Sequence, residues 1–278
     1  MKHIGKSYDK VDAKGILSGK PSYTGDFVPK DALIIKVLRS PHAQAKIKSI
    51  DTSKAKLIPG VEAIFTYEDV PNTRFTLAGQ TYPEPSAYDA LILDPVVRYV
   101  GDEVALVVAK DEATALKAMP LIKVEYEVQK PVLDLRTAMD HETVVHPEDD
   151  ILNHIPVGQD YKRNICVSYH KRVGDIEGEL AKCDYVVEGT YFDQATRQSA
   201  MEPFQSFGYI DHLGRIVIVS STQIVFHVRR HIARALGIPA SKIRVIKPRI
   251  GGGFGSKQTA CTELMTAFVT WKLQKPCY

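Results

Sequence analysis

The stretch IGGGFGSKQ, residues 250–258, combines four glycines with one phenylalanine and one lysine. It follows a predicted strand at 243–247 and precedes a predicted helix at 262–273. A strand that enters a glycine loop and then a helix presents free backbone N–H groups, which favours an anion or a planar ligand close to the main chain. The alternative is a glycine turn with a structural role only. Phe254, between two glycines, is expected to pack against something, which favours the binding role.

Two common phosphate-binding patterns do not fit this loop. A P-loop reads G-x-x-x-x-G-K-[ST], and the chain has Ser256 in place of the second glycine and Gln258 in place of the final hydroxyl residue. The dinucleotide pattern G-x-G-x-x-G, started at Gly251, also requires glycine where Ser256 stands. The sequence therefore predicts neither an ATPase nor a nicotinamide site at this loop.

The composition excludes several other classes of protein. With 278 residues, 44% hydrophobic and 25% charged, the chain is expected to be globular and long enough for two domains with separate cores. A net charge of +3 gives no reason to expect nucleic-acid binding. The four cysteines lack C-x-x-C spacing, so we expect reduced, buried thiols and no zinc or iron–sulfur cluster. No apolar signal segment or membrane span is recognisable, and the expected location is the cytoplasm.

The first half of the chain has a β-rich pattern with one helix. The helix is predicted at 110–121, with Asp111 as its N-cap and Pro120 bending it or ending it early. Residues 133–159 show little periodicity and are interpreted as a linker between two domains. The predicted strands are 32–38, 45–50, 61–65, 96–109 and 122–126.

The second half has α/β character. A helix at 224–236, closed by Gly237 and Pro239, separates two strands, which predicts a β-α-β stretch that ends at the glycine loop. The expected fold class is therefore mixed, α+β in the first part and α/β in the second. The predicted strands are 185–192, 207–210, 216–221 and 243–247, with a turn at 211–214.

Eight stretches in the order of the sequence resemble the molybdenum-binding subunit of the xanthine dehydrogenase and aldehyde oxidase family. The first four, at 5–27, 38–66, 97–109 and 124–127, are similar to the family's hammerhead domain. The others, "AMEP", "SSTQ", "LGIPASKIRV" and "GGGFGSK", are similar to the start of its molybdopterin-binding part. The resemblance implies a hammerhead domain at 1–135, a linker at 136–160 and the N-terminal part of an incomplete molybdopterin-binding domain at 161–278.

The resemblance also implies roles for particular residues. Gln223, which closes the S-T-Q stretch, would hydrogen-bond an oxo ligand of molybdenum without adding charge beside the metal. The glycine loop would lie against the metal's ligands and the pterin, and Phe254 would also pack near an aromatic substrate. No residue is expected to ligate the metal directly. The implied cofactor-binding residues are Gln223, Gly252, Gly253, Phe254 and Gly255.

The family hydroxylates a carbon atom with water as the oxygen source and passes two electrons through iron–sulfur centres to FAD. At Gln258, xanthine-oxidising members have a glutamate that contacts the purine, so the expected substrate is a purine-like N-heterocycle or an aldehyde. The family's general base falls beyond Tyr278, so we expect the chain alone to be inactive. Its expected partners are the remainder of the molybdenum subunit, an iron–sulfur subunit and an FAD subunit. The alternative is a non-catalytic remnant that serves as a subunit-contact module.

Other polar residues have alternative interpretations. His227 and His231 have the i, i+4 spacing of a metal pair, but two intervening arginines favour a solvated helix face. Glu202 lacks a second carboxylate at a defined spacing and is interpreted as a buried hydrogen-bond acceptor that supports the cofactor domain. Arginines that could contact an anion, or could simply be solvated, are Arg197, Arg229 and Arg230.

Overall fold

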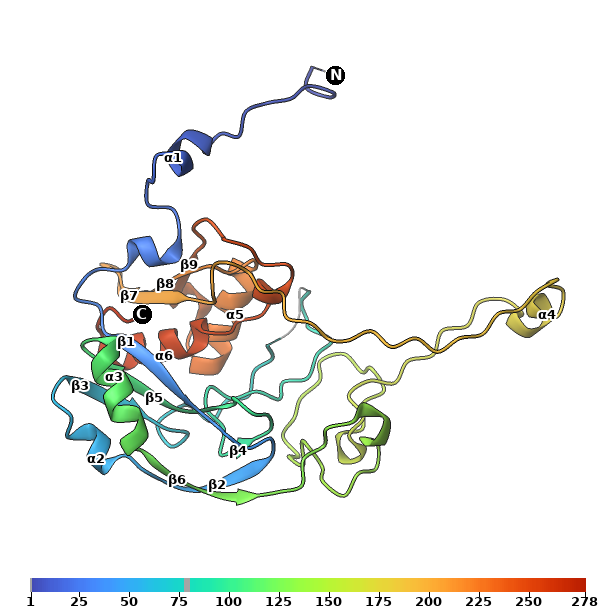
Figure 1. Ribbon diagram of the computed structural model, residues 1–278, viewed down its shortest axis with the longest axis horizontal. Helices are drawn as coiled ribbons and strands as arrows, with labels where there is room; N and C mark the ends of the chain where they lie inside the picture. The colour runs from blue at the N-terminus through green and yellow to red at the C-terminus, as the bar shows by residue number, and fades with distance from the viewer. Residues whose placement is uncertain (1, 78–80) are drawn as a thin grey trace.

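The computed structural model describes residues 2–77 and 81–278 (Figure 1). Residues 1 and 78–80, which fall within the predicted hammerhead domain, lie outside the described part. The described residues form three three-stranded sheets and five α-helices of five or more residues, which pack near the sheets or project from them. The short elements outside the sheets are α1 (Ala13–Leu17), η1 (Thr24–Phe27), η3 (Leu135–Thr137), η4 (Tyr161–Arg163), α4 (Ile176–Leu180) and η5 (Ala240–Lys242).

Two antiparallel sheets form the first part of the molecule. The first has the order β1 (Ile34–Arg39), β5 (Glu103–Ala109) and β3 (Val61–Phe65), and the second has the order β4 (Val96–Val97), β2 (Ala45–Asp51) and β6 (Lys123–Val128). β5 is central and almost wholly buried, because six of its seven residues are apolar. The strands predicted at 32–38, 45–50, 61–65 and 122–126 are confirmed. The predicted strand 96–109 is wrong as one element, because the chain turns at 98–102, where Asp102 accepts from the Arg98 N–H.

The predicted helix of the first half is α3 (Glu112–Ala118), which packs on the first sheet together with α2 (Ser53–Lys56). Asp111 is its N-cap, since its carboxylate accepts from the Thr114 N–H at 2.7 Å. The helix ends before Pro120, which lies in the short turn η2 (Met119–Leu121). Both predictions about the ends of this helix are confirmed.

The third sheet carries the predicted β-α-β stretch. β7 (Ser206–Ile210) and β8 (Ile216–Ser220) form a hairpin, and β8 runs parallel to β9 (Ile243–Ile246). The crossover helix α5 (Val225–Leu236) packs on β9, and α6 (Glu263–Leu273) packs on β7 and β8. The predicted helices at 224–236 and 262–273 and the strands at 207–210, 216–221 and 243–247 are confirmed.

The strand predicted at 185–192 is wrong. This segment lies in an arm that projects away from the rest of the molecule (Figure 1), and no strand is assigned to it. Its apolar side chains are exposed, with Tyr185 at 91% and Phe192 at 92%. A segment rich in β-branched and aromatic residues becomes a strand only beside another strand, and no described strand lies next to the arm.

The largest hydrophobic core is shared between the two parts of the chain. It joins Leu106 and Val108 of β5 to Ile218 of β8 and Phe268 of α6. The expectation of two separate cores is therefore wrong for this cluster. α6 fills the space between the sheets (Figure 1), which explains why eight consecutive residues, Glu263 to Thr270, are buried on all sides of the helix.

The last three residues connect the sheets. Cys277 exchanges two backbone hydrogen bonds with Gly208 of β7, at 2.8 and 2.9 Å. On the other side, the Leu33 and Ile35 N–H groups donate to the carbonyls of Pro276 and Tyr278. Residues 276–278 thus occupy the position of a strand between β1 and β7.

Two remaining predictions concern thiols and membranes. All four cysteines are free, but only Cys277 is buried, whereas Cys166 and Cys183 are exposed, contrary to expectation. Within residues 2–77 and 81–278, no helix is long and apolar enough to cross a membrane.

Candidate functional site

The candidate site lies where two parallel strands end. β8 leads into residues 221–223 and β9 leads toward the glycine loop, so both segments emerge at the same edge of the sheet. The edge at the carboxyl ends of parallel strands is the usual place for a ligand in an α/β layer. The fold therefore brings together Gln223 and the glycine loop, as the sequence predicted.

Gln223 is held against the loop. Its backbone N–H donates to the Lys257 carbonyl at 2.8 Å, and its side-chain Oε1 is buried without a hydrogen-bond partner among the described residues. A methyl group added to Gly253 would lie 2.6 Å from that Oε1. Only glycine at position 253 leaves the Gln223 amide in this place, next to the main chain of the loop.

The loop also offers unused backbone donors. Gly252 and Gly255 have positive φ angles of 101° and 88°, and the Gly253 carbonyl accepts from both the N–H and the hydroxyl of Ser256. Across the described chain, no hydrogen bond is found from the N–H groups of residues 252–255. Consecutive free N–H groups in such a turn form a concave site for oxygen atoms of a ligand.

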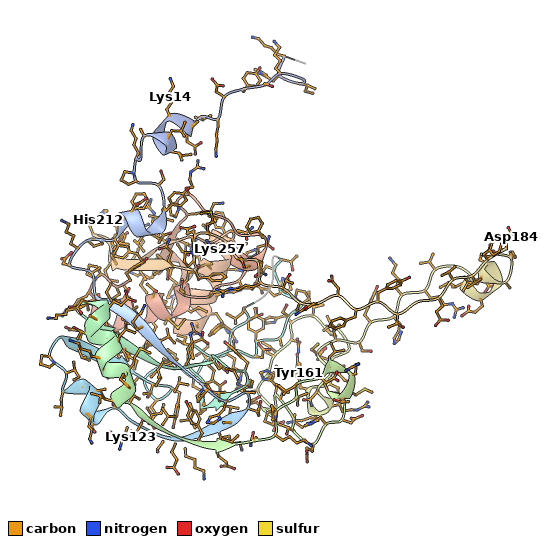
Figure 2. All side chains as sticks on the ribbon, viewed as in Figure 1. Lys14, Lys123, Tyr161, Asp184, His212 and Lys257 are labelled. Atoms are coloured by element: carbon orange, nitrogen blue, oxygen red, sulfur yellow. The ribbon has the colours of Figure 1, made fainter. Side chains whose placement is uncertain are left out.

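A buried ion pair between Lys257 and Glu202 stabilises the glycine loop. Lys257 is 2% exposed and its Nζ donates to both the carbonyl and the carboxylate of Glu202, at 2.9 and 3.0 Å (Lys257 is labelled in Figure 2). The same carboxylate accepts from the Gly251 N–H at 2.7 Å and from Gln205 Nε2 at 2.8 Å. The prediction that Glu202 is a buried acceptor is confirmed. Sequence reasoning missed its partner Lys257, because nothing in the local pattern distinguishes a buried lysine from an exposed one.

A second buried carboxylate, Glu263, was also missed. Ser220 Oγ donates to it at 2.5 Å and the Cys261 N–H at 2.9 Å, so it ties the end of β8 to the start of α6. Burial raises the pKa of Glu263 above the usual range of a glutamate, and these hydrogen bonds only partly offset that effect. Its place in the first turn of a helix was the only signal in the sequence.

The aromatic residue of the loop differs from expectation. Phe254 is 76% exposed and has a φ of 50°, so the prediction that it packs against something is wrong for the described chain. A Cβ added to Gly252 would lie 3.1 Å from Cε2 of this ring and 3.2 Å from the Ala200 Cβ. Gln258 lies in the short turn η6 (Ser256–Gln258), partly buried, with its N–H donating to the Gly255 carbonyl.

The histidine pair and two of the three arginines lie within the folded part of the chain. His231 is 3% exposed, so the predicted solvated face is wrong for it, and burial lowers its pKa to about 4. No group of three or more metal-ligating side chains is found among the described residues. Arg230 pairs with buried Glu84 at 2.8 Å and Arg229 donates to the Ala240 carbonyl, whereas Arg197 is exposed on the arm.

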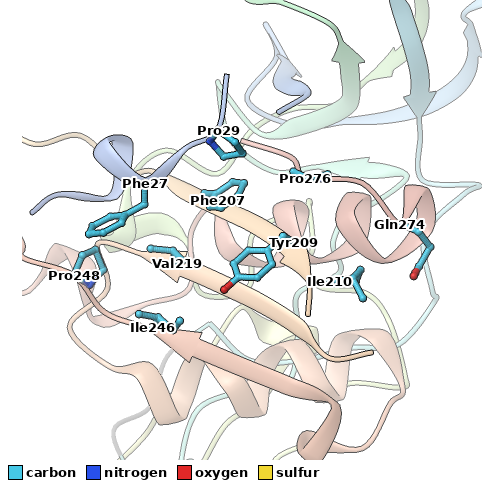
Figure 3. A pocket seen from close by; sticks show the side chains of 10 residues that line it. All are labelled: Phe27, Pro29, Phe207, Tyr209, Ile210, Val219, Ile246, Pro248, Gln274 and Pro276. Atoms are coloured by element: carbon cyan, nitrogen blue, oxygen red, sulfur yellow. The ribbon is translucent and has the colours of Figure 1, made fainter. Parts of the chain in front are cut away.

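An apolar hollow lies elsewhere, on the face of the third sheet opposite α5 and α6 (Figure 3). It measures about 620 Å³, and Tyr209, Val219 and Ile246 point into it from the three strands. Phe27 and Pro29 of the N-terminal segment form one rim. It carries no charged side chain, so it is a surface for apolar contact and not a site for acid–base chemistry.

Two family models match the chain. Residues 18–130 match the a/b hammerhead domain of aldehyde oxidase and xanthine dehydrogenase, and residues 157–278 match the molybdopterin cofactor-binding domain. The chain belongs to the xanthine dehydrogenase and aldehyde oxidase family. The mixed α/β fold, with a hammerhead domain followed by molybdopterin-binding sequence, is thereby confirmed, as is molybdopterin as the family's cofactor.

The names of the relatives in this family refer to different substrates. The chain is 40% identical to the probable hypoxanthine oxidase XdhD of Escherichia coli K12, over 98% of the chain and 31% of XdhD. It is 30% identical to the nicotinate dehydrogenase large molybdopterin subunit of Eubacterium barkeri, over 98% of the chain and 60% of that subunit. Quinoline 2-oxidoreductase of Pseudomonas putida 86 superposes with a TM-score of 0.82 at 29% identity, over 99% of this chain and 34% of that one. The chain thus spans about a third of the length of most of these relatives.

The residues at the strand ends fit such a cofactor. The Gln223 side chain lies against Gly253, where an added Cβ would come within 2.6 Å of its Oε1, and its amide can donate a hydrogen bond without adding charge to the site. The N–H groups of residues 252–255, which donate to no acceptor among the described residues, belong to the same loop. A group with several oxygen atoms and little tolerance for added charge matches these donors and this neutral amide.

Proposed function

We propose that this chain forms part of the molybdenum site of a hydroxylase that oxidises a purine-like N-heterocycle or an aldehyde at carbon, with water as the oxygen source. The observation that carries the proposal is the contact between the Gln223 amide and Gly253, beside the free N–H groups of the loop. The names of three relatives, which refer to hypoxanthine, nicotinate and quinoline, favour an N-heterocycle.

Each residue has a defined part in this proposal. The molybdenum cofactor, when bound, supplies the two-electron oxidation of the substrate. The Gln223 N–H₂ group would donate to an oxygen of the cofactor, and the N–H groups of residues 252–255 would hold further oxygen atoms. The exposed ring of Phe254 offers a flat face for an aromatic substrate, and Gln258 can hydrogen-bond a ring nitrogen without adding charge.

The chain covers only about a third of XdhD, so the proposed activity requires further polypeptide. We propose that the remaining part of a molybdenum subunit supplies the general base and most pterin contacts. Iron–sulfur and FAD subunits would carry the electrons away. Four free cysteines suit a reducing compartment, and we propose the cytoplasm as the location.

The second candidate is a non-catalytic module for subunit contact. The exposed arm and the apolar hollow on the third sheet favour it, since both offer apolar surface to a partner. Molybdenum and pterin content after co-expression with candidate partner subunits discriminates between the two functions. Stable complexes without molybdenum in every pairing would establish the contact module and refute the hydroxylase.

The test of the hydroxylase proposal is Gln223→Ala in the reconstituted complex. Turnover is expected to fall about 10- to 100-fold, as is typical for residues that orient a metal centre, while subunit assembly stays intact. Gln194→Ala, on the exposed arm, is the matched control and should leave turnover unchanged. Unchanged turnover in Gln223→Ala, at equal molybdenum content, would rule out its assigned role.

A further inference from the structure

A pocket lies between α5 and the residues 75–76 and 82–88 of the first half of the chain. It measures about 310 Å³, which is at the lower end of the range for sites that bind small molecules. The helix lines it with Arg230, His231 and Arg234. The opposite wall is largely aromatic and includes Phe75, Tyr82 and Tyr88. The pocket therefore has room for a molecule of one or two rings, between an aromatic wall and a basic one.

The acidic residue of the pocket, Glu84, already has its partners. Its side chain is buried, and its two oxygens accept from Arg230 Nη2 and from the Tyr88 hydroxyl, each at 2.8 Å. The charge of Glu84 thus compensates the charge of Arg230. Arg234 has no acidic partner among the described residues, so the lining of the pocket carries one uncompensated positive charge.

Two neighbouring side chains of the helix have buried polar atoms without a partner. Both ring nitrogens of His231 and the Nε of Arg230 are buried, and none of them forms a hydrogen bond within the described residues. His231 is 3% exposed, and burial keeps its imidazole neutral at pH 7, so one ring nitrogen donates and the other accepts. Buried polar groups without a partner are rare in folded proteins. Two of them in the wall of one pocket indicate that a bound molecule supplies the missing partners.

The uncompensated arginine is held in place but keeps two donors for a ligand. Arg234 Nε donates to the Arg74 carbonyl at 3.1 Å, and the guanidinium carbon lies 5.4 Å from the centroid of the Tyr88 ring. Its two terminal nitrogens, Nη1 and Nη2, donate to no acceptor within the described residues. Two such N–H groups in one plane match the two oxygens of a carboxylate.

We propose that this pocket binds a small aromatic carboxylate, with the carboxylate on Arg234 and the ring against the aromatic wall. The single negative charge of such a molecule matches the one arginine that no acidic side chain compensates. The flat ring matches the aromatic wall, which an inorganic anion would not use. The polar atoms of His231 and Arg230 Nε would pair with the ligand. None of these residues takes part in the proposed hydroxylase, so binding is expected in the chain without its cofactor.

The test measures binding of benzoate to the purified chain by isothermal titration calorimetry, with benzamide and inorganic phosphate as comparison ligands. Benzamide keeps the shape of benzoate without its charge, and phosphate keeps a negative charge without the ring. Benzoate is expected to bind at least about tenfold more tightly than either, because only benzoate offers both features. Equal binding of benzoate and benzamide, tighter binding of phosphate, or no binding of benzoate would overturn the proposal.

Variants locate the binding in this pocket. Arg234→Met keeps an apolar stem at an exposed position and removes the two terminal donors, so benzoate binding should weaken at least about tenfold. Arg234→Lys keeps the charge without the paired donors and should recover only part of that loss. His231→Phe removes both ring nitrogens and should also weaken binding. Arg244→Met, at an exposed arginine of β9, is the matched control and should leave binding unchanged. The proposal is wrong if Arg234→Met and Arg244→Met have the same effect.

Discussion

Lys257 is the residue on which the candidate site depends most for its shape. Its ammonium group is paired with Glu202 in a region where both side chains are less than a tenth exposed. Removing one partner of a buried pair leaves an uncompensated charge, so Lys257→Met is expected to lower the free energy of unfolding by about 3–5 kcal/mol. Urea denaturation of the purified chain measures this change.

Two further variants identify the cause of that loss. Lys257→Met combined with Glu202→Gln removes both charges, so the double variant should recover part of the loss. Lys182→Met breaks an exposed pair with Glu179 and should cost less than about 1 kcal/mol. Equal losses for Lys257→Met and Lys182→Met would contradict a stabilising role for the buried pair.

Sequence reasoning at the residue scale worked best where the chemistry is local. Asp111 was recognisable as an N-cap because the cap and its helix are adjacent in sequence. The pairing of Lys257 with Glu202, 55 residues apart, is set by tertiary structure and leaves no local trace. Phe254 was predicted to pack from its size alone, yet the positive φ of the loop turns its ring outward.

At the scale of elements, α5 meets the segment 82–88 through His231. Burial lowers the pKa of this histidine from 6.5 to about 4, although Glu84 lies 4.0 Å away and opposes the shift; Arg230 and His227 add to it. The folded chain therefore binds fewer protons than the unfolded chain between these two values. The contribution of neutral His231 to the free energy of unfolding is fully present above pH 6.5. It is lost as the pH falls toward 4, and the total loss is about 3 kcal/mol.

This pH dependence can be measured by denaturation at pH 7 and pH 5. In His231→Phe, the loss of unfolding free energy between these pH values should be smaller than in the unchanged chain by about 2 kcal/mol. Phenylalanine suits the site because neither ring nitrogen of His231 has a hydrogen-bond partner among the described residues. His212→Gln, in an exposed turn, should keep the full dependence. An unchanged pH dependence in His231→Phe would show that His231 titrates normally.

The sequence predicted those elements that are buried within this chain. The β8-α5-β9 unit was correct because the apolar pattern of each element meets a partner close in sequence. The segment 96–109 was read as one strand because its apolar residues continue through the turn at 98–102. The pattern at 185–192 signals burial, but a pattern does not reveal whether the partner lies within the same chain.

For the whole molecule, the resemblance found in the sequence gave the right family and cofactor, but not the way the parts join. The core shared by β5, β8 and α6, and the position of residues 276–278 between β1 and β7, arise from contacts between distant segments. Among the described residues, the apolar hollow of the third sheet and the arm both present apolar side chains to the surface.

The arm gives the last prediction. Figure 2 labels Asp184 at its far end, and Tyr185, Val187, Tyr191 and Phe192 are each about nine-tenths exposed. Because the arm contributes little to the core, proteases should cut the free chain first within residues 171–199. We expect the part of a molybdenum subunit that this chain does not match to bury these apolar side chains and to protect the arm from cleavage.

Substitution separates this contact from folding. Tyr191→Ser with Phe192→Ser should weaken binding of that partner at least about tenfold, since each exposed aromatic side chain would bury a large apolar area. The same change should leave the unfolding free energy of the chain alone within about 0.5 kcal/mol, because neither side chain packs on the core. Leu213→Ser, at an exposed apolar residue of the β7–β8 turn, is the matched control and should affect neither quantity. Cleavage of the arm at the same rate in the complex as in the free chain would show that the partner does not bind it.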